Sequence, residues 1–133
     1  MEQPEVLACV SKWLESQTQL TLGIAFGSLV TERFGPNSDV DLAVMGATAL
    51  SVDERVEMAQ NLGALVSRNI DLIDLRTNHG LIVKQALTKG VRLKNTDPTA
   101  FAERLSKFYF NETYYGPLRD RAYRERRLHV FGI

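Results

Sequence analysis

Hydrophobic residues along this chain follow two spacings, one typical of helices and one typical of buried strands. From Pro4 to about Gln19, apolar residues recur at every third or fourth position, which predicts a helix with one buried face. The residues on that face are Val6, Cys9, Val10, Trp13 and Leu14. Because a free cysteine on such a face is usually a buried apolar residue, we interpret Cys9 as a core thiol rather than a nucleophile.

Short apolar segments between the predicted helices have the length and composition of strands. Leu20 to Phe26, Asp39 to Met45 and Asn69 to Leu75 are predicted to be strands of one sheet. Val91 to Lys94 is shorter and predicts an edge strand. After the first strand, Leu29 to Phe34 has room only for a short helical turn, which a Gly-Pro-Asn-Ser turn cluster stops.

A helix is predicted between the second and third strands. Ser51, with Glu54 three residues later, forms a capping box that opens a helix reaching to about Arg68. The apolar positions assigned to its buried stripe are Val56, Ala59, Leu62, Leu65 and Val66.

Two further helices are predicted after the third strand. Asn78 is expected to cap a helix from His79 to Lys89, and Gly90 is expected to end it in a left-handed conformation. Asp97 and Pro98 then open a long helical segment. The alternation of helices and strands predicts an α/β domain in which helices cover a sheet of three or four strands.

Composition narrows the classes of protein that the chain can belong to. Its 133 residues suit one domain with one core, and its formal net charge of zero gives no global electrostatic case for a nucleic-acid or membrane partner. Cys9 is the single cysteine, which excludes an intrachain disulfide and fits a reducing compartment. No apolar run is long enough to span a membrane, and the N-terminus lacks signal-peptide character, so a cytoplasmic location is expected.

Candidate catalytic and binding residues lie around the first two predicted strands. Gly27-Ser28 follows the first strand, and ten residues separate Ser28 from Asp39-Val40-Asp41 at the start of the second. Asp39 and Asp41 are two positions apart, so in a strand their side chains lie on the same side of the pleat and can share metal ions. The N–H groups and hydroxyl of a Gly-Ser turn can hold phosphate oxygens. This pattern predicts half of a site for a nucleotide and magnesium.

The third strand can supply the other half. It carries Asp71 and Asp74, which point to opposite faces because they are three positions apart, so only one of them can join Asp39 and Asp41. Three carboxylates from adjacent strands are a ligand set suited to a hard cation such as Mg²⁺.

These motifs together resemble a minimal nucleotidyltransferase (MNT) domain of the polymerase β-like superfamily, and the resemblance covers essentially the whole chain. It implies that superfamily's fold, a small mixed sheet of three or four strands flanked by helices. It also implies one domain over residues 1–133, whose C-terminal helical segment, from about residue 97, packs on it or contacts a partner. The spacer departs from the family pattern, because Leu29 follows the serine, Glu32 sits mid-spacer and Arg33 is its only cation.

The resemblance assigns roles by position. Gly27 and Ser28 would hold the β- and γ-phosphates of ATP, while Asp39 and Asp41 would bind two Mg²⁺ ions. Asp71 matches the family's third strand, and it would bind the catalytic ion and help to activate the attacking hydroxyl. The chain would therefore be a Mg²⁺-dependent nucleotidyltransferase.

Small bacterial proteins of this kind resemble the antitoxins of HEPN–MNT toxin–antitoxin pairs. The resemblance implies a HEPN-domain ribonuclease toxin as partner in a hetero-oligomer, and transfer of AMP from ATP to a toxin hydroxyl, expected to be a tyrosine. Neither direct nucleic-acid binding nor membrane binding is expected.

Two other functions stay open: an antitoxin that acts by binding alone, and a nucleotidyltransferase that acts on a small molecule. The C-terminal segment, Phe108 to Ile133, mixes aromatic residues with arginines, a composition enriched in protein interfaces, although its aromatics could equally pack against the fold. Gly116-Pro117 is expected to break the helix there. Cations that could meet the triphosphate are Arg68, Lys84, Arg92 and Lys94.

Overall fold

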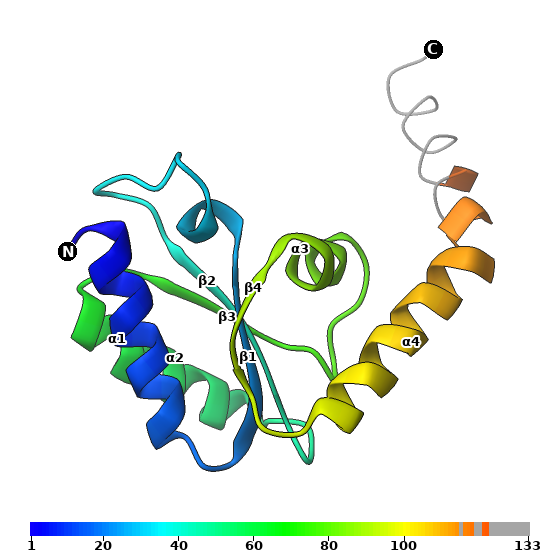
Figure 1. The fold of residues 1–133 in the computed structure, drawn as a ribbon, viewed down its shortest axis with the longest axis horizontal. Coiled ribbons are helices and arrows are strands. Elements are labelled where there is room, and N and C mark those ends of the chain that lie inside the picture. Colours follow the sequence, from blue (N-terminus) through cyan, green and yellow to red (C-terminus); the bar gives the residue numbers. More distant parts are fainter. Residues whose placement is uncertain (115, 119–120, 123–133) are drawn as a thin grey trace. The chain divides into compact units, whose positions relative to one another are not determined.

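The computed structural model describes residues 1–114, 116–118 and 121–122 of the chain (Figure 1). The chain divides into two compact units, Met1–Pro98 and Thr99–Ile133. The first unit contains the sheet and every residue assigned above to a nucleotide and metal site.

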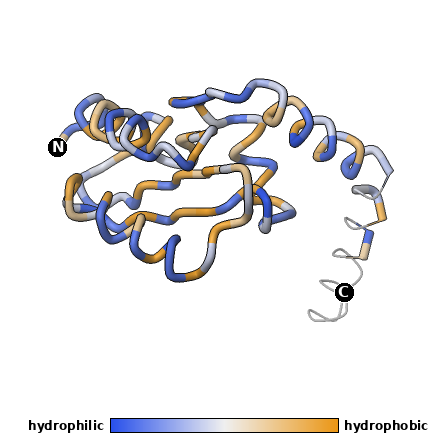
Figure 2. The backbone as a smooth tube through the Cα atoms, turned by 90° about the horizontal axis from the view of Figure 1, so that it is seen from below, coloured by the Kyte–Doolittle hydropathy of each residue, from blue (hydrophilic) through white to orange (hydrophobic). Residues whose placement is uncertain are grey.

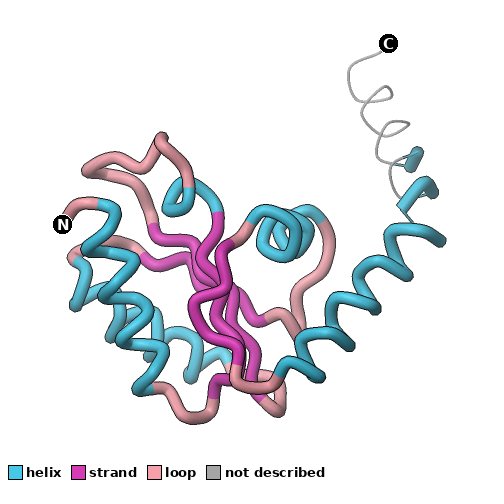
Figure 3. The backbone as a smooth tube through the Cα atoms, in the orientation of Figure 1, coloured by secondary structure: helices cyan, strands magenta, loops and turns pink. Residues whose placement is uncertain are grey.

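The centre of the first unit is a four-stranded mixed sheet with the order β3-β2-β1-β4 (Figure 3). Its strands are β1 (Leu20–Phe26), β2 (Val40–Gly46), β3 (Ile70–Asp74) and β4 (Val91–Asn95). β1 pairs antiparallel with both β2 and β4, whereas β2 and β3 run parallel. The predicted mixed α/β sheet is therefore confirmed, including β4 as an edge strand.

Helices α1 (Gln3–Ser16) and α2 (Val52–Val66) lie on one side of the sheet, and α3 (Leu81–Lys89) lies on the other (Figure 1). Hydrophobic residues follow the strands, coloured orange in Figure 2. A hydrophobic core cluster joins α1, α2 and β2 through residues that include Val6, Val10, Leu14, Val40, Leu42, Val44, Met58, Leu62 and Val66. Cys9 is half-buried and packs against this cluster, as a core thiol would. Val40, Leu42 and Val44 are buried against the helices. Asp41 alternates with them along β2, so its side chain lies on the opposite face of the strand.

The buried stripe of α2 differs from the predicted one. Its capping box is confirmed, because the Ser51 hydroxyl accepts from the Glu54 N–H and the Glu54 carboxylate accepts from the Ser51 N–H, both at 3.1 Å. Val56 and Leu65, however, are about half exposed, whereas Met58 is buried. Successive steps of three residues turn by about 300°, so the series from Val56 to Leu65 sweeps about half-way round the helix, and both of its ends lie outside the buried face.

The ends of α3 also correct the prediction. Gly80 (φ 83°), not Asn78, occupies the N-cap, and the Asn78 side-chain amide instead donates to the Asp74 carbonyl at 2.9 Å. Gly90 follows the helix with φ −77°, so its conformation is not left-handed. A glycine is required there because a Cβ would collide with the Ala86 carbonyl and the Ile24 side chain. Gly90 is therefore required because the end of α3 lies close to β1, and not because its backbone is left-handed.

The short turn after β1 is a 3-10 helix, η1 (Gly27–Val30), which begins two residues earlier than predicted. Beyond the sheet, α4 (Pro98–Tyr114) begins at the predicted proline. Residues 116–118 and 121–122 are helical, and the predicted break at Gly116-Pro117 depends on residue 115, which lies outside the described residues.

Candidate functional site

Three strands bring the predicted site residues together at one end of the sheet. Asp41 of β2 lies directly across from Asp71 in the parallel β2–β3 pair, and across from Phe26 in the antiparallel β1–β2 pair. Neighbouring strands lie about 4.8 Å apart, so Asp41 has Asp71 on one side and the end of β1 on the other. Asp39, which is exposed, immediately precedes β2. The strand register therefore groups Asp71, rather than Asp74, with the Asp-x-Asp motif.

The pKa of Asp41 reflects how closely these acids approach one another. Burial raises the pKa of the Asp41 carboxyl from 3.8 to about 6, and the negative charge of Asp71, a hydrogen bond with Asp71 and the charge of Asp39 all act in the same direction. The three acidic side chains thus form one mutually repelling group, which we call the acidic trio. Such a group gains stability from a cation bound among its oxygens.

Gly27 closes the other side of the acidic trio. Its φ of +68° is in the region that favours glycine, and a Cβ there would collide with Oδ2 of Asp41. Gly27 and half-buried Ser28 form the first residues of η1, directly after β1. The Gly-Ser motif is therefore held against the carboxylate that the strand register places at the centre of the trio.

Asp74 belongs to a different environment. Its side chain is fully buried, and its two carboxylate oxygens accept from the backbone N–H groups of Leu50 at 2.8 Å and Arg76 at 2.9 Å. The bond from Leu50 ties the end of β3 to the loop that precedes α2, and the bond from Arg76 holds the turn that follows β3. Asp74 therefore stabilises the fold and takes no part in the acidic trio.

We expect Asp74→Asn to lower the free energy of unfolding by about 1–3 kcal/mol, because an amide NH₂ would face a buried N–H that has lost its acceptor. Urea denaturation followed by circular dichroism measures this change. An Asn variant as stable as the wild type would contradict the structural role of the two hydrogen bonds.

A second prediction concerns the pH dependence of stability in metal-free buffer. The folded protein holds the Asp41 proton more tightly than the unfolded chain, so the contribution of Asp41 to stability is greatest at low pH and is lost as the pH rises from about 4 through about 6. Because the side chain is partly exposed, solvent screening keeps this penalty on the order of 1 kcal/mol. Asp41→Asn should therefore raise the melting temperature at pH 7.5 by a few degrees and by less at pH 5. Calorimetry in EDTA at both pH values measures it, and a variant destabilised at pH 7.5 would show that the repulsion is absent.

The donor chemistry of the acidic trio fits a divalent oxygen-seeking cation such as Mg²⁺. Asp41 and Asp71 already share a hydrogen bond, and Asp39 lies within electrostatic range of Asp41. Across the part of the chain that the structure describes, no three His, Cys, Asp or Glu side chains are arranged around one point as a finished metal site. Asp39 is exposed and lies just outside β2, so its placement decides whether the trio can act together.

Two of the cations proposed for the triphosphate have other partners. The ammonium group of Lys94 on β4 donates to the carbonyls of Leu14 and Gln17, each at 2.9 Å, and so caps the C-terminal end of α1. The guanidinium group of Arg68 donates to backbone carbonyls of the spacer between Ser28 and Asp39. Sequence reasoning could not find these roles, because backbone carbonyls leave no residue pattern.

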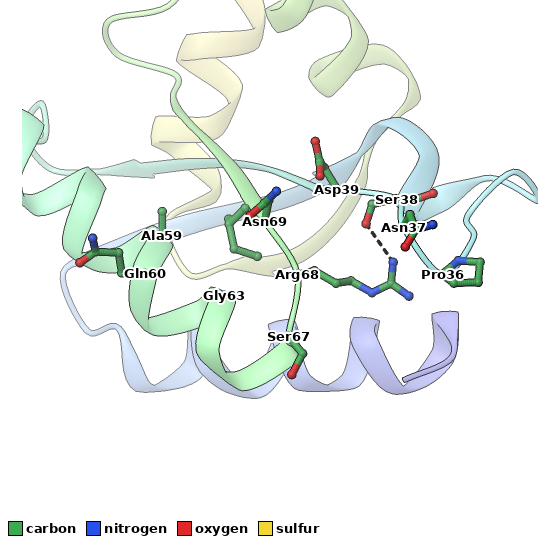
Figure 4. A pocket seen from close by; sticks show the side chains of 11 residues that line it. Pro36, Asn37, Ser38, Asp39, Ala59, Gln60, Gly63, Ser67, Arg68 and Asn69 are labelled. Carbon is green, nitrogen blue, oxygen red and sulfur yellow. Dashed lines mark hydrogen bonds between the residues drawn. The ribbon is translucent and has the colours of Figure 1, made fainter.

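An open cleft of about 790 Å³ adjoins the site beside Asp39 (Figure 4). The cleft is lined by residues 36–39, which lead into β2, by Ala59, Gln60 and Gly63 of α2, and by residues 67–70 between α2 and β3. Of the five predicted site residues, Asp39 alone is among those lining it. The cleft therefore lies beside the acidic trio and does not enclose it.

Comparison with known proteins decides the family. The family model "Polymerase beta, Nucleotidyltransferase" matches residues 9–99, which contain all three members of the acidic trio and the Gly-Ser motif. The chain belongs to this nucleotidyltransferase family. The fold predicted from the Gly-Ser and Asp-x-Asp motifs is thereby confirmed for the first unit.

Relatives within this nucleotidyltransferase family carry more specific names. The chain is 34% identical over 93 residues to "Protein adenylyltransferase MntA" of Shewanella oneidensis, an alignment that covers 68% of this chain and 67% of that protein. It also resembles a crystal structure of a toxin–antitoxin with AMP-PNP, with a TM-score of 0.71, 27% identity and coverage of 87% of this chain and 97% of the other. A complex of tri-AMPylated HEPN toxin with MNT antitoxin from Shewanella oneidensis gives a TM-score of 0.67 at 25% identity, covering 91% and 98%.

Within the described ranges, none of the helices combines the length and hydrophobicity needed to cross a bilayer.

Proposed function

We propose that this protein is an antitoxin that transfers AMP from ATP to a hydroxyl group of a HEPN-domain toxin and so inactivates the toxin. The observation that carries the proposal is the pairing of Asp41 with Asp71 against Gly27, in a chain 34% identical to a protein adenylyltransferase. The resemblance to a complex that contains a tri-AMPylated HEPN toxin supports the choice of acceptor. ATP and a ribonuclease toxin would both be met in the cytoplasm, which is the proposed location.

The roles of the residues follow from their placement. Asp39, Asp41 and Asp71 would hold two Mg²⁺ ions, which supply charge neutralisation and align the attacking and leaving oxygens of an in-line displacement. Gly27 and Ser28 would bind the β- and γ-phosphates through N–H groups and the serine hydroxyl, which orients the α-phosphorus toward the acidic trio. Asp71, across the strand pair from Asp41, would accept the proton of the acceptor hydroxyl.

The proposed reaction balances without a further reactant. The acceptor oxygen forms a bond to the α-phosphorus of ATP, and the bond from that phosphorus to the oxygen bridging to the β-phosphate breaks. Pyrophosphate leaves with its electron pair, and the hydroxyl proton passes to Asp71. The product is an AMP ester of the acceptor side chain, for which we propose a toxin tyrosine.

Labelled ATP tests the proposed function directly. The protein is incubated with ATP labelled in the α-phosphate, Mg²⁺ and its HEPN-domain partner, and label on the partner is counted after separation. We expect transfer by the wild type, and none by the double variant Asp39→Asn/Asp41→Asn or in EDTA. Asp53→Asn, which removes an exposed acid from the start of α2, is the matched control and should transfer normally. Equal labelling by the double variant would refute the proposal.

An antitoxin that neutralises by binding alone is the second candidate, because α4 exposes aromatic rings. Tyr109, Phe110 and Tyr114 are each more than half exposed, and the last two rings lie 4.5 Å apart, whereas Phe108 is buried. The remaining aromatics of the segment, Tyr115, Tyr123 and Phe131, lie outside the described residues, as does most of its arginine-rich end. We propose that the segment from about residue 97 contributes to the contact with the toxin.

Toxin neutralisation without ATP separates the two candidates. If binding suffices, the double Asn variant still suppresses the toxin's ribonuclease activity, and truncation after Gly116 abolishes the suppression. If transfer is needed, the double variant fails although it still binds. Modification of a small molecule in the absence of any partner would favour the third possibility, a small-molecule nucleotidyltransferase.

A further inference from the structure

Arg68 lies in the turn between α2 and β3, and its side chain reaches across to the spacer that carries Asp39. Its Nη1 donates to the carbonyls of Gly35 at 2.7 Å and Ser38 at 2.9 Å, and its Nη2 donates to the carbonyl of Met1 at 3.2 Å. Figure 4 shows the guanidinium group directed at Ser38, with this hydrogen bond dashed. The Cζ atom also lies 4.2 Å from the centre of the Phe34 ring. One half-buried side chain thus joins three segments of the chain.

The local backbone explains why this side chain can reach the spacer. α2 ends at Ser67, whose φ of 54° is left-handed, and the Arg68 N–H donates back to the Gly63 carbonyl at 3.3 Å. The chain therefore reverses direction at Ser67, and Arg68 leaves the helix axis toward the spacer. A guanidinium group suits the position because its planar donors can serve several carbonyls while its face lies over an aromatic ring.

The bonds of Arg68 and of the next residue in the turn, Asn69, flank Asp39 on both sides. Arg68 binds the carbonyl of Ser38, which belongs to the peptide unit preceding Asp39. The carbonyl of Asn69 accepts from the Val40 N–H at 2.9 Å, which belongs to the peptide unit following Asp39. Two adjacent residues therefore fix both peptide units of Asp39, in the same turn that leads directly into β3 and Asp71.

We infer that Arg68 is a positioning residue, which holds Asp39 where it can share a cation with Asp41 and Asp71. Asp39 is exposed, so the backbone that carries it, rather than packing of its side chain, sets its position. The inference rests on the proposed function, since it assigns Asp39 to an ion. Arg68 itself is engaged with backbone carbonyls, and it acts on the reaction only through Asp39.

Metal binding and backbone exchange test the inference together. Arg68→Met removes the donors and keeps much of the side chain's length. We expect it to weaken binding of Mn²⁺ in the presence of a non-hydrolysable ATP analogue by about tenfold, the size of effect typical of residues that orient metal ligands. Titration calorimetry measures this, and amide hydrogen exchange should show faster exchange at Val40. Arg68→Lys keeps a charge but not the planar fork, so its Mn²⁺ affinity and its Val40 exchange rate should lie between those of the wild type and Arg68→Met.

Lys94→Met is the matched control, because Lys94 also donates to two backbone carbonyls but at the end of α1, away from Asp39. It should lower the melting temperature and leave both Mn²⁺ binding and Val40 exchange as in the wild type. The inference is overturned if Arg68→Met loses stability but retains wild-type Mn²⁺ affinity and Val40 exchange. If Arg68→Met does not fold, Arg68→Lys gives the same test. A wild-type protein that fails to bind Mn²⁺ with the nucleotide analogue contradicts the proposed function, and Val40 exchange then decides the inference alone.

Discussion

Asp71→Asn is expected to lower the rate of AMP transfer by about 1,000-fold or more, which corresponds to about 4 kcal/mol of transition-state stabilisation. The amide keeps the shape of the side chain and removes the charge that would bind the catalytic ion and accept the hydroxyl proton. Because Asp71 is exposed, lies at the edge of the sheet and repels Asp41, the same substitution should not lower the stability. Single-turnover measurement of transfer to the HEPN toxin, with enzyme in excess, gives the rate of the chemical step.

Asp74→Asn is the natural control for this prediction, since both aspartates lie on β3 only three positions apart. It should remain within about threefold of the wild-type transfer rate at a temperature where it is folded, because a stability change of the expected size leaves most molecules native. If Asp74→Asn instead abolishes transfer and Asp71→Asn does not, the register of β3 against β2 is wrong.

Gly27→Ala is the second substitution with a large expected effect. A Cβ at this left-handed position adds backbone strain of about 1–2 kcal/mol and collides with Oδ2 of Asp41. The Asp41 carboxylate must then move away from Gly27 and so leaves its position in the acidic trio. Displacement of a reacting group by about 1 Å can lower a rate by roughly 100-fold, and we expect a loss of about that size in kcat.

Gly35→Ala serves as the matched control for Gly27→Ala. Gly35 lies in the same spacer region, and the nearest atoms to an added Cβ are 3.9 Å away, which is ordinary contact. It should leave transfer and stability close to wild type. Wild-type activity in Gly27→Ala, measured in the same assay, would mean that the glycine does not approach Asp41 as the structure shows.

The sequence predicted the strands and the grouping of Gly27-Ser28 with Asp39 and Asp41 because these rest on local patterns. The alternation of strand side chains showed that Asp71 and Asp74 face opposite ways, but not which of them faces Asp41. That choice depends on the register between two strands separated by α2, a non-local property that the family resemblance supplied and the Asp41–Asp71 pairing reproduces. The family motif was enough to predict Asp71, whereas the pairing of β2 with β3 explains physically why Asp71 faces Asp41.

Other features had no signal in the sequence. Arg68 bonds carbonyls of residues 30, 33 and 67 positions away, and any residue type can supply a backbone carbonyl. Gly90 was expected for its conformational freedom, whereas the structure requires it for the close packing of α3 on β1. In both cases tertiary contacts decide the role of the residue, and local patterns cannot report them.

Intact-mass spectrometry of the HEPN toxin, after incubation with this protein, ATP and Mg²⁺, tests the proposed transfer most directly. We expect the toxin to gain the mass of one or more adenylyl groups, fragmentation to place them on tyrosine, and Asp71→Asn to leave the toxin unmodified. A toxin whose mass is unchanged by the wild-type protein, or that is modified equally by Asp71→Asn, would contradict it.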